Sequence, residues 1–139
     1  MMVRSPKAYL RDSGLLHSLL GLTEEGELLG HPAYGASWEG FAIENILGAL
    51  GPGWRVGFYR TAAGAELDLV LERANERLAV ECKASSAPTV SRGFWTALED
   101  LKVKRAFVVA PIKEPFPLGR GAMALPLDEL LRTLVKLAP

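Results

Sequence analysis

The sequence contains one cysteine, Cys82, and therefore cannot form a disulfide within the chain. Cysteine usage of this kind favours a reducing compartment and predicts a cytoplasmic protein. No stretch approaches the roughly 18 consecutive apolar residues that a membrane-spanning helix needs. The first residues include Arg4, Lys7 and Arg11 and do not have the apolar core of a signal peptide. We therefore expect no membrane partner.

The sequence also lacks net charge, because 16 Lys and Arg balance 16 Asp and Glu. A neutral chain has no overall attraction to nucleic acid, so such binding would require a local patch. Lys102, Lys104 and Arg105 form one basic cluster, at the end of a predicted helix. Cations are favoured at a helix C-terminus in any case, so a structural role is the preferred interpretation there.

Several motifs of established chemistry are missing as well. No G-x-x-x-x-G-K-[ST] phosphate loop occurs, so any ATPase must lie outside these residues. His17 and His31, together with a single cysteine, do not have the spacing of a zinc site. The sequence therefore excludes a nucleotide-hydrolysing motor and a structural zinc domain within the chain.

Hydrophobic residues make up 49% of the 139 residues and charged residues 23%, which is typical of a globular domain. We predict one α/β domain over residues 1–139, with helices and strands in mixed order. Ser13, Ser37 and Pro126 mark the starts of three of the helices. Helices are expected over 14–20, 38–50, 91–101 and from 126 on, and strands over 9–10, 55–61, 65–72, 78–83, 105–110 and 122–125.

The second half of the chain allows three finer predictions. The continuous apolar run 105–110 is typical of a strand buried on both faces. The stretch from 78–83 through the helix 91–101 to 105–110 fits a right-handed parallel crossover. The last helix is amphipathic, and its apolar face is formed by Leu130, Leu131, Leu134 and Val135.

The strands over 65–72 and 78–83 are separated by the length of a hairpin loop. Side chains alternate along a strand, so Leu67, Leu69 and Leu71 are expected on a core face. The opposite face would carry four charged residues, namely Glu66, Asp68, Glu81 and Lys83. A turn centred between Ala74 and Asn75 sets Asp68 opposite Glu81 and Glu66 opposite Lys83, whereas a shift by two residues makes Asp68 and Glu81 diagonal neighbours.

Two carboxylates on directly opposed residues lie about 5 Å apart. At that distance they repel each other by roughly 3 kcal/mol at an effective dielectric constant of about 20. A divalent cation between Asp68 and Glu81 would turn this repulsion into a net attraction. Mg²⁺ suits such a site, because it binds through one or two carboxylates while it keeps waters and substrate phosphates as further ligands. Lys83, on the same side, would stabilise a developing phosphate charge or a water nucleophile. The alternative is the ordinary alternation of charges on the wet face of a hairpin.

Glu44 lies in the predicted helix over 38–50, on the flank of its apolar stripe. Gly40 and Gly48 lie one turn to either side, and such small neighbours would allow the carboxylate to approach the sheet or a ligand. The alternative is an ordinary glutamate at the boundary of an amphipathic helix.

Three segments together resemble the PD-(D/E)xK nuclease superfamily: Trp38–Asn45 (WEGFAIEN), Gly64–Val70 (GAELDLV) and Ala79–Ser85 (AVECKAS). More narrowly, they resemble the uncharacterised domain that follows the ATPase module in many prokaryotic AAA-type ATP-binding proteins, and residues 5–16 fit the start of that domain. The resemblance implies a restriction-endonuclease-like core with a mixed β-sheet flanked by helices. One departure is that no proline precedes the acidic motif Glu66-Leu67-Asp68.

The resemblance also implies roles for the acidic residues. Asp68 and Glu81 would be ligands of Mg²⁺ or Mn²⁺, Lys83 the catalytic lysine and Glu44 the helical acid. The first hypothesis is therefore a metal-dependent hydrolase that cleaves phosphodiester bonds in DNA or RNA. The alternative is a non-catalytic nuclease-like module that binds nucleic acid or protein, with an ATPase module in cis or in trans. The chain would then be the C-terminal part of a longer protein or a stand-alone relative.

Overall fold

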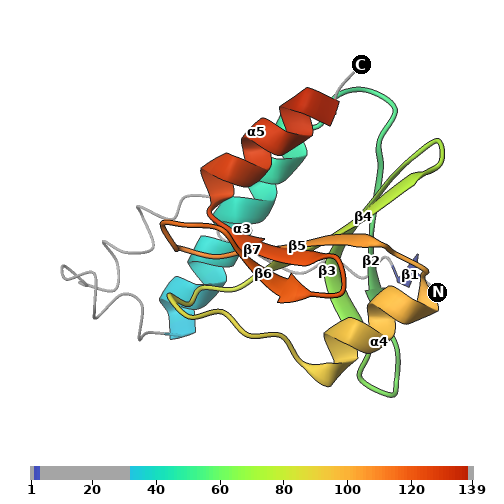
Figure 1. Ribbon diagram of the computed structural model, residues 1–139, viewed down its shortest axis with the longest axis horizontal. Coiled ribbons are helices and arrows are strands. Elements are labelled where there is room, and N and C mark those ends of the chain that lie inside the picture. Colours follow the sequence, from blue (N-terminus) through green and yellow to red (C-terminus); the bar gives the residue numbers. More distant parts are fainter. Residues whose placement is uncertain (1, 4–31, 138–139) are drawn as a thin grey trace.

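The computed structural model describes residues 2–3 and 32–137 (Figure 1). The strand predicted at 9–10 and the helix predicted over 14–20 lie outside the described residues. No described helix has the length and apolar character needed to cross a membrane. The elements are β1 (Met2–Val3), α3 (Pro32–Ala49), β2 (Arg55–Arg60), β3 (Glu66–Arg73), β4 (Glu76–Cys82), α4 (Arg92–Asp100), β5 (Arg105–Val109), β6 (Phe116–Gly119), β7 (Ala122–Leu125) and α5 (Leu127–Leu137).

The strands form one mixed sheet of order β1-β2-β3-β4-β5-β7-β6. Strands β1 to β4 are antiparallel neighbours, whereas β4, β5 and β7 run parallel. Helices α3 and α5 lie together on one face of the sheet, and α4 lies on the other (Figure 1). The predicted α/β class, with a mixed sheet flanked by helices, is confirmed. The parallel crossover from β4 through α4 to β5 is confirmed as well.

Each face of the sheet has its own apolar core. On one face, Ile46 of α3 and Leu130 of α5 pack against Leu71 and Val80. On the other, Phe94 of α4 packs with Val70, Ala79 and Val108. Strand β5 contributes buried residues to both, as its uninterrupted apolar sequence predicted. Strand β4 lies in the middle of the sheet and has buried residues in both cores. Its C-terminal end is therefore shielded from bulk water.

Three details of the helices and strands differ from prediction. Helix α3 begins at Pro32, so Ser37 is buried within the helix and does not cap it; proline is favoured in a first helical turn, where its missing N–H costs nothing. Val135, expected in the core, is 61% exposed. Strand β6 was not predicted, because a segment containing Pro117 and ending in Gly119 has low strand propensity; it lies at the edge of the sheet, where proline is tolerated.

A bulge in β3 alters the predicted faces. Gly57 pairs with Val70 and Tyr59 with Leu67, so two residues of β3, Asp68 and Leu69, lie opposite one residue of β2. The extra residue interrupts the alternation. Leu67 consequently packs in the core beneath α4, whereas Leu69 packs in the core beneath α3 and α5. The prediction that Leu67 and Leu69 share a face is wrong for this reason.

Candidate functional site

The β3–β4 hairpin has the first of the two predicted registers, with the turn centred between Ala74 and Asn75. Arg73 pairs with Glu76 across the two-residue turn Ala74-Asn75, and the pairing continues to Leu69 and Val80. One step further along, the same register sets Asp68 opposite Glu81. The hairpin thus brings the two predicted metal ligands together at the end of β4, next to the bulge.

The two carboxylates bridge the strands where the regular pairing ends. The Asp68 backbone N–H donates to Oε1 of Glu81 at 2.7 Å, and the Cys82 N–H donates to Oδ2 of Asp68 at 3.0 Å. Each side chain therefore accepts from the backbone of the opposite strand. These reciprocal hydrogen bonds hold both carboxylates in place and orient them toward the same end of the hairpin.

Glu81 is a buried carboxyl group, with 7% of its surface exposed. Burial, followed by the negative charge of Asp68, raises the pKa of Glu81 to about 8. The Asp68 N–H hydrogen bond and the charge of Lys83 act in the opposite direction but are weaker. The pair therefore holds a proton near neutral pH or needs a cation to remain fully ionised.

Lys83 lies directly beyond β4. Its Nζ atom is 3.9 Å from Oε2 of Glu81, and 40% of its side chain is exposed. Its backbone N–H donates to the carbonyl of Val109 at 2.8 Å, which fixes the segment against β5. Asp68, Glu81 and Lys83 therefore converge as predicted, with the ammonium group on the solvent side. Glu66, expected opposite Lys83, instead forms an ion pair with Arg60 at 3.3 Å.

Glu44 does not join this cluster, contrary to the expectation that it would approach the sheet. Its side chain is exposed and lines a shallow groove with Asn45 of α3 and Leu131 of α5. Ala42 and Ile46 are the residues of this part of α3 that enter the core. A position two residues from each of them lies about 160–200° around the helix, so Glu44 points away from the sheet.

The other acidic residue of α3, Glu39, is half-buried and was not singled out by the sequence analysis. It precedes Ile46 by seven residues and so lies on the same, sheet-facing side of the helix. Gly35, one turn before it, faces the segment after β4: a Cβ there would lie 3.8 Å from that of Ala84. The seven-residue spacing to Ile46 was the sequence signal that could have identified Glu39 as the inward-facing acid.

The donor set for a cation consists of two carboxylates. In the described part of the chain, no group of three or more His, Cys, Asp or Glu side chains is arranged to hold a metal ion. Asp68 and Glu81 supply hard oxygen donors in a partly desolvated setting, and the pKa of Glu81 is raised. That chemistry suits Mg²⁺ or Mn²⁺, which accept two carboxylates and complete their coordination with water or phosphate oxygens. The residues present thus fit such an ion, with few protein ligands.

Comparison with known proteins gives matches without assigned activity. A family model described as a domain of unknown function (DUF4143) matches residues 34–130. The uncharacterized proteins Mb2031c of Mycobacterium bovis and Rv2008c of Mycobacterium tuberculosis are each 42% identical to the chain over 130 residues. The aligned region covers 94% of this chain but 29% of each relative, so the chain spans less than a third of their length. No solved structure matches.

Proposed function

The chain belongs to the DUF4143 family, and we propose that in this member Asp68, Glu81 and Lys83 form a PD-(D/E)xK-type site for metal-dependent hydrolysis of phosphodiester bonds in DNA or RNA. The observation that carries the proposal is the meeting of the two carboxylates, with an ammonium group 3.9 Å from Glu81, at the end of the β3–β4 hairpin. A purely structural hairpin has no need of a buried carboxylate beside a second one, because like charges there destabilise the fold.

The architecture supports a restriction-endonuclease-like core. A helix, a three-stranded antiparallel unit, a second helix and a strand parallel to β4 follow one another in the chain. The site lies where β4 ends and the chain leaves for the crossover, at the C-terminal ends of β4 and β5 near Val109. The bulge at Asp68 fits this interpretation, because bulges next to active sites re-aim side chains.

In the proposed reaction, three residues of the chain would bind the metal ion and stabilise charge on the phosphate. Asp68 and Glu81 would hold Mg²⁺ or Mn²⁺, which when bound polarises a phosphoryl oxygen and lowers the pKa of water. Lys83 would place its Nζ beside the attacked phosphate and stabilise the charge that develops there. The two backbone hydrogen bonds keep the carboxylates from rotating away. Glu44 has no part in this proposal because it faces the opposite side of α3.

The test combines metal binding with cleavage. We expect Mn²⁺ to bind wild-type protein in titration calorimetry and to bind neither Asp68→Asn nor Glu81→Gln. Lys83→Ala should retain the metal but nick supercoiled DNA, or cleave RNA, at least about 100-fold more slowly. The matched control is Glu72→Gln, at the other end of β3. Undiminished cleavage by Lys83→Ala, or metal binding that survives Glu81→Gln, would refute the assignment.

A second candidate is a non-catalytic module that binds nucleic acid or a protein, and one observation favours it. Both carboxylates already accept backbone hydrogen bonds, an arrangement that could serve only to close the end of the hairpin. The greater length of the relatives leaves room for an ATPase module in cis, and cytoplasmic location is part of the same proposal. Failure of wild-type protein to bind Mn²⁺, with nucleic-acid binding unchanged in Asp68→Asn, would establish this candidate instead.

A further inference from the structure

Helix α4 ends in a capping arrangement that builds an apolar surface. Beyond the C-cap residue Leu101, the Lys102 N–H donates to the Glu99 carbonyl at 3.1 Å and the Val103 N–H to the Leu98 carbonyl at 2.9 Å. This pair of bonds defines a Schellman motif, in which the second residue beyond the cap packs on the helix. Val103 and Leu98 consequently form the floor of a hollow beside the helix end.

Two of the cationic side chains at this hollow lie on strained backbone. Lys102 has φ 55° and Arg120 has φ 50°, both in the left-handed region that glycine occupies without penalty. Arg120 lies in the β6–β7 turn between Gly119 and Gly121, which have φ 96° and 82°. Side chains kept at left-handed positions are more common at functional sites than elsewhere. Lys102 stands where a Schellman motif usually has glycine.

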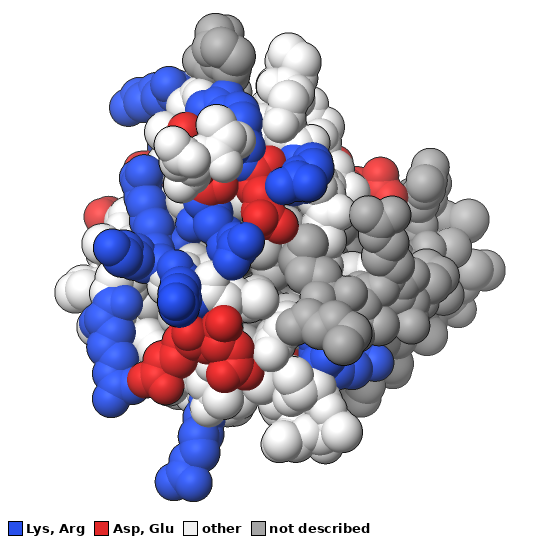
Figure 2. Space-filling model, turned by 90° about the vertical axis from the view of Figure 1, so that its right-hand side faces the viewer, with Lys and Arg blue, Asp and Glu red and all other residues white. Residues whose placement is uncertain are grey.

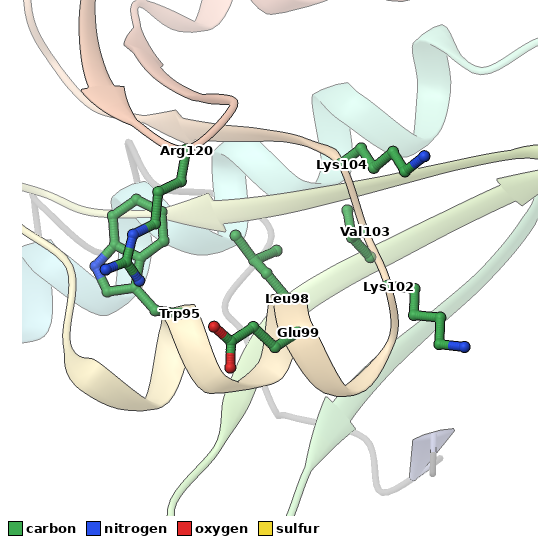
Figure 3. A pocket seen from close by; sticks show the side chains of 7 residues that line it. All are labelled: Trp95, Leu98, Glu99, Lys102, Val103, Lys104 and Arg120. Atoms are coloured by element: carbon green, nitrogen blue, oxygen red, sulfur yellow. The ribbon is translucent and has the colours of Figure 1, made fainter.

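The hollow is large enough for one ligand group, at about 400 Å³. Figure 3 shows Arg120 and Trp95 over each other at one end, Lys102 and Lys104 at the other, and the apolar floor between them. The guanidinium carbon of Arg120 is 5.4 Å from the centre of a Trp95 ring. The lining residues are Trp95, Leu98, Glu99, Lys102, Val103, Lys104 and Arg120.

The charge of this lining is unbalanced, with three cations and one acid, Glu99. In the described part of the chain, Lys102, Lys104 and Arg120 form no ion pair, whereas Arg77, close to the same helix end, is paired with Glu72 at 2.8 Å. Figure 2 shows Lys and Arg side chains gathered along one side of the face toward which the C-terminal end of α4 points. The chain as a whole is neutral, so this excess is local.

We propose that this hollow, the α4 groove, binds a single strand of nucleic acid. One base would stack at the Trp95–Arg120 end, while Lys102 and Lys104 contact the phosphates of the neighbouring nucleotides. An aromatic ring beside a guanidinium plane, with cations at both ends of an apolar floor, suits a ligand that alternates flat rings and negative charges. A duplex hides its base faces, and an acidic peptide offers no ring at regular spacing.

The groove is separate from the carboxylate site. Lys104 directly precedes Arg105, which pairs with Leu78 at one end of β4, whereas Glu81 pairs with Val108 toward the other end. Binding in the groove therefore requires neither the metal nor cleavage. The groove would hold a nucleic-acid strand at the opposite end of β4 and β5 from the proposed reaction.

The test is fluorescence anisotropy of a labelled single-stranded oligonucleotide, with EDTA present, over a range of salt concentrations. We expect Lys102→Gly to weaken binding roughly fivefold and to reduce the slope of log K against log salt by about 0.7, as for one lost phosphate contact. Arg120→Gly should also weaken binding roughly fivefold, through the lost stacking partner of the base. Both variants should melt at the wild-type temperature or above it, because glycine relieves the strained φ. Trp95→Leu should weaken binding roughly 5- to 150-fold through lost stacking.

Two controls make the result specific. Glu99→Gln should tighten binding, since it removes the one negative charge of the lining, and Lys136→Ala, on α5 at the other face of the sheet, should leave it unchanged. Glu81→Gln should bind like wild type, which separates the groove from the proposed hydrolysis. Binding unaffected by Lys102→Gly and Arg120→Gly, equal affinity for duplex, or equally effective competition by a free mononucleotide would each overturn the proposal, whatever the outcome of the cleavage assay.

Discussion

The carboxyl group of Glu81 is where this fold departs from ordinary burial of apolar side chains. It retains 7% of its exposed surface, lies next to Asp68 and is 3.9 Å from Nζ of Lys83. An ionised carboxylate in such a place costs free energy, which is why its pKa rises to about 8. The ionised Glu81 carboxylate therefore destabilises the fold at the end of the β3–β4 hairpin, and a bound proton or cation removes this cost.

This cost predicts a pH dependence of stability. The pKa of Glu81 is higher in the folded chain than in the unfolded one, so the folded state binds the extra proton between about pH 4.5 and 8. Without divalent metal, the free energy of unfolding should fall as pH rises through that window, by an amount on the order of 5 kcal/mol. Urea denaturation at a series of pH values measures it.

The matched variant is Glu81→Gln, whose amide can still accept the Asp68 N–H but carries no charge. It should lose this pH dependence and be more stable than wild type at pH 8. Mn²⁺ at pH 8 should stabilise wild type and not the variant, because only the ionised pair gains from a cation. A wild-type stability that stays level from pH 5 to pH 8 would show that Glu81 titrates normally.

At the scale of elements, the N-terminal end of α4 is held close to the turn between β2 and β3. Ser91 caps its N-terminus by accepting from the Phe94 N–H at 3.3 Å. Just inside that cap, Gly93 packs against the turn between β2 and β3, where a Cβ would lie 2.2 Å from the Gly64 carbonyl oxygen. The helix can approach the turn this closely only because the residue has no side chain.

The close approach predicts that Gly93→Ala destabilises the protein by roughly 1–3 kcal/mol, since the turn or the helix must move. Gly48→Ala in α3 is the matched control: a Cβ there meets nothing within 4 Å, and alanine should stabilise the helix by about 0.5–1 kcal/mol. Urea midpoints of the two variants measure both effects. Equal midpoints for Gly93→Ala and wild type would mean that α4 does not need this contact.

At the scale of the whole molecule, stability is concentrated at the centre of the sheet. Strands β4 and β5 are parallel neighbours covered by α3 and α5 on one face and by α4 on the other. Strand β6 lies at one edge of the sheet, is mostly exposed and contains Pro117, which cannot donate a backbone hydrogen bond. Opening the centre exposes both cores at once, whereas opening the edge exposes little apolar surface.

This arrangement predicts the pattern of native-state hydrogen exchange. Amides of β4 and β5 should exchange only through global unfolding, with opening free energies equal to that measured by urea. Amides of β6 should exchange through local opening at several kcal/mol less. Nuclear magnetic resonance at increasing low concentrations of urea distinguishes the two classes. Equal protection of β6 and β4 would indicate that the sheet opens as one unit.

What the sequence determined by itself is local or follows from short-range periodicity. The two-residue turn and the alternation of side chains limited Asp68 to two positions, opposite Glu81 or diagonal to it, with Lys83 close by, and the structure has the first of them. The apolar character of residues 105–110 sufficed to predict a strand buried on both faces. These predictions succeed because register across a tight turn and the period of a strand are properties of neighbouring residues.

The tertiary structure decided which side of each element faces the site. Glu44 and Glu39 both belong to α3, and the packing of Ile46 against the sheet shows which face of the helix is inward and that Glu39 shares it. The pairing of β2 with β3 creates the bulge that sends Leu67 to the α4 side. The burial of Glu81 and the α4 groove likewise arise from elements distant in sequence. Contacts of that kind depend on how helices and strands pack together, which no local periodicity specifies.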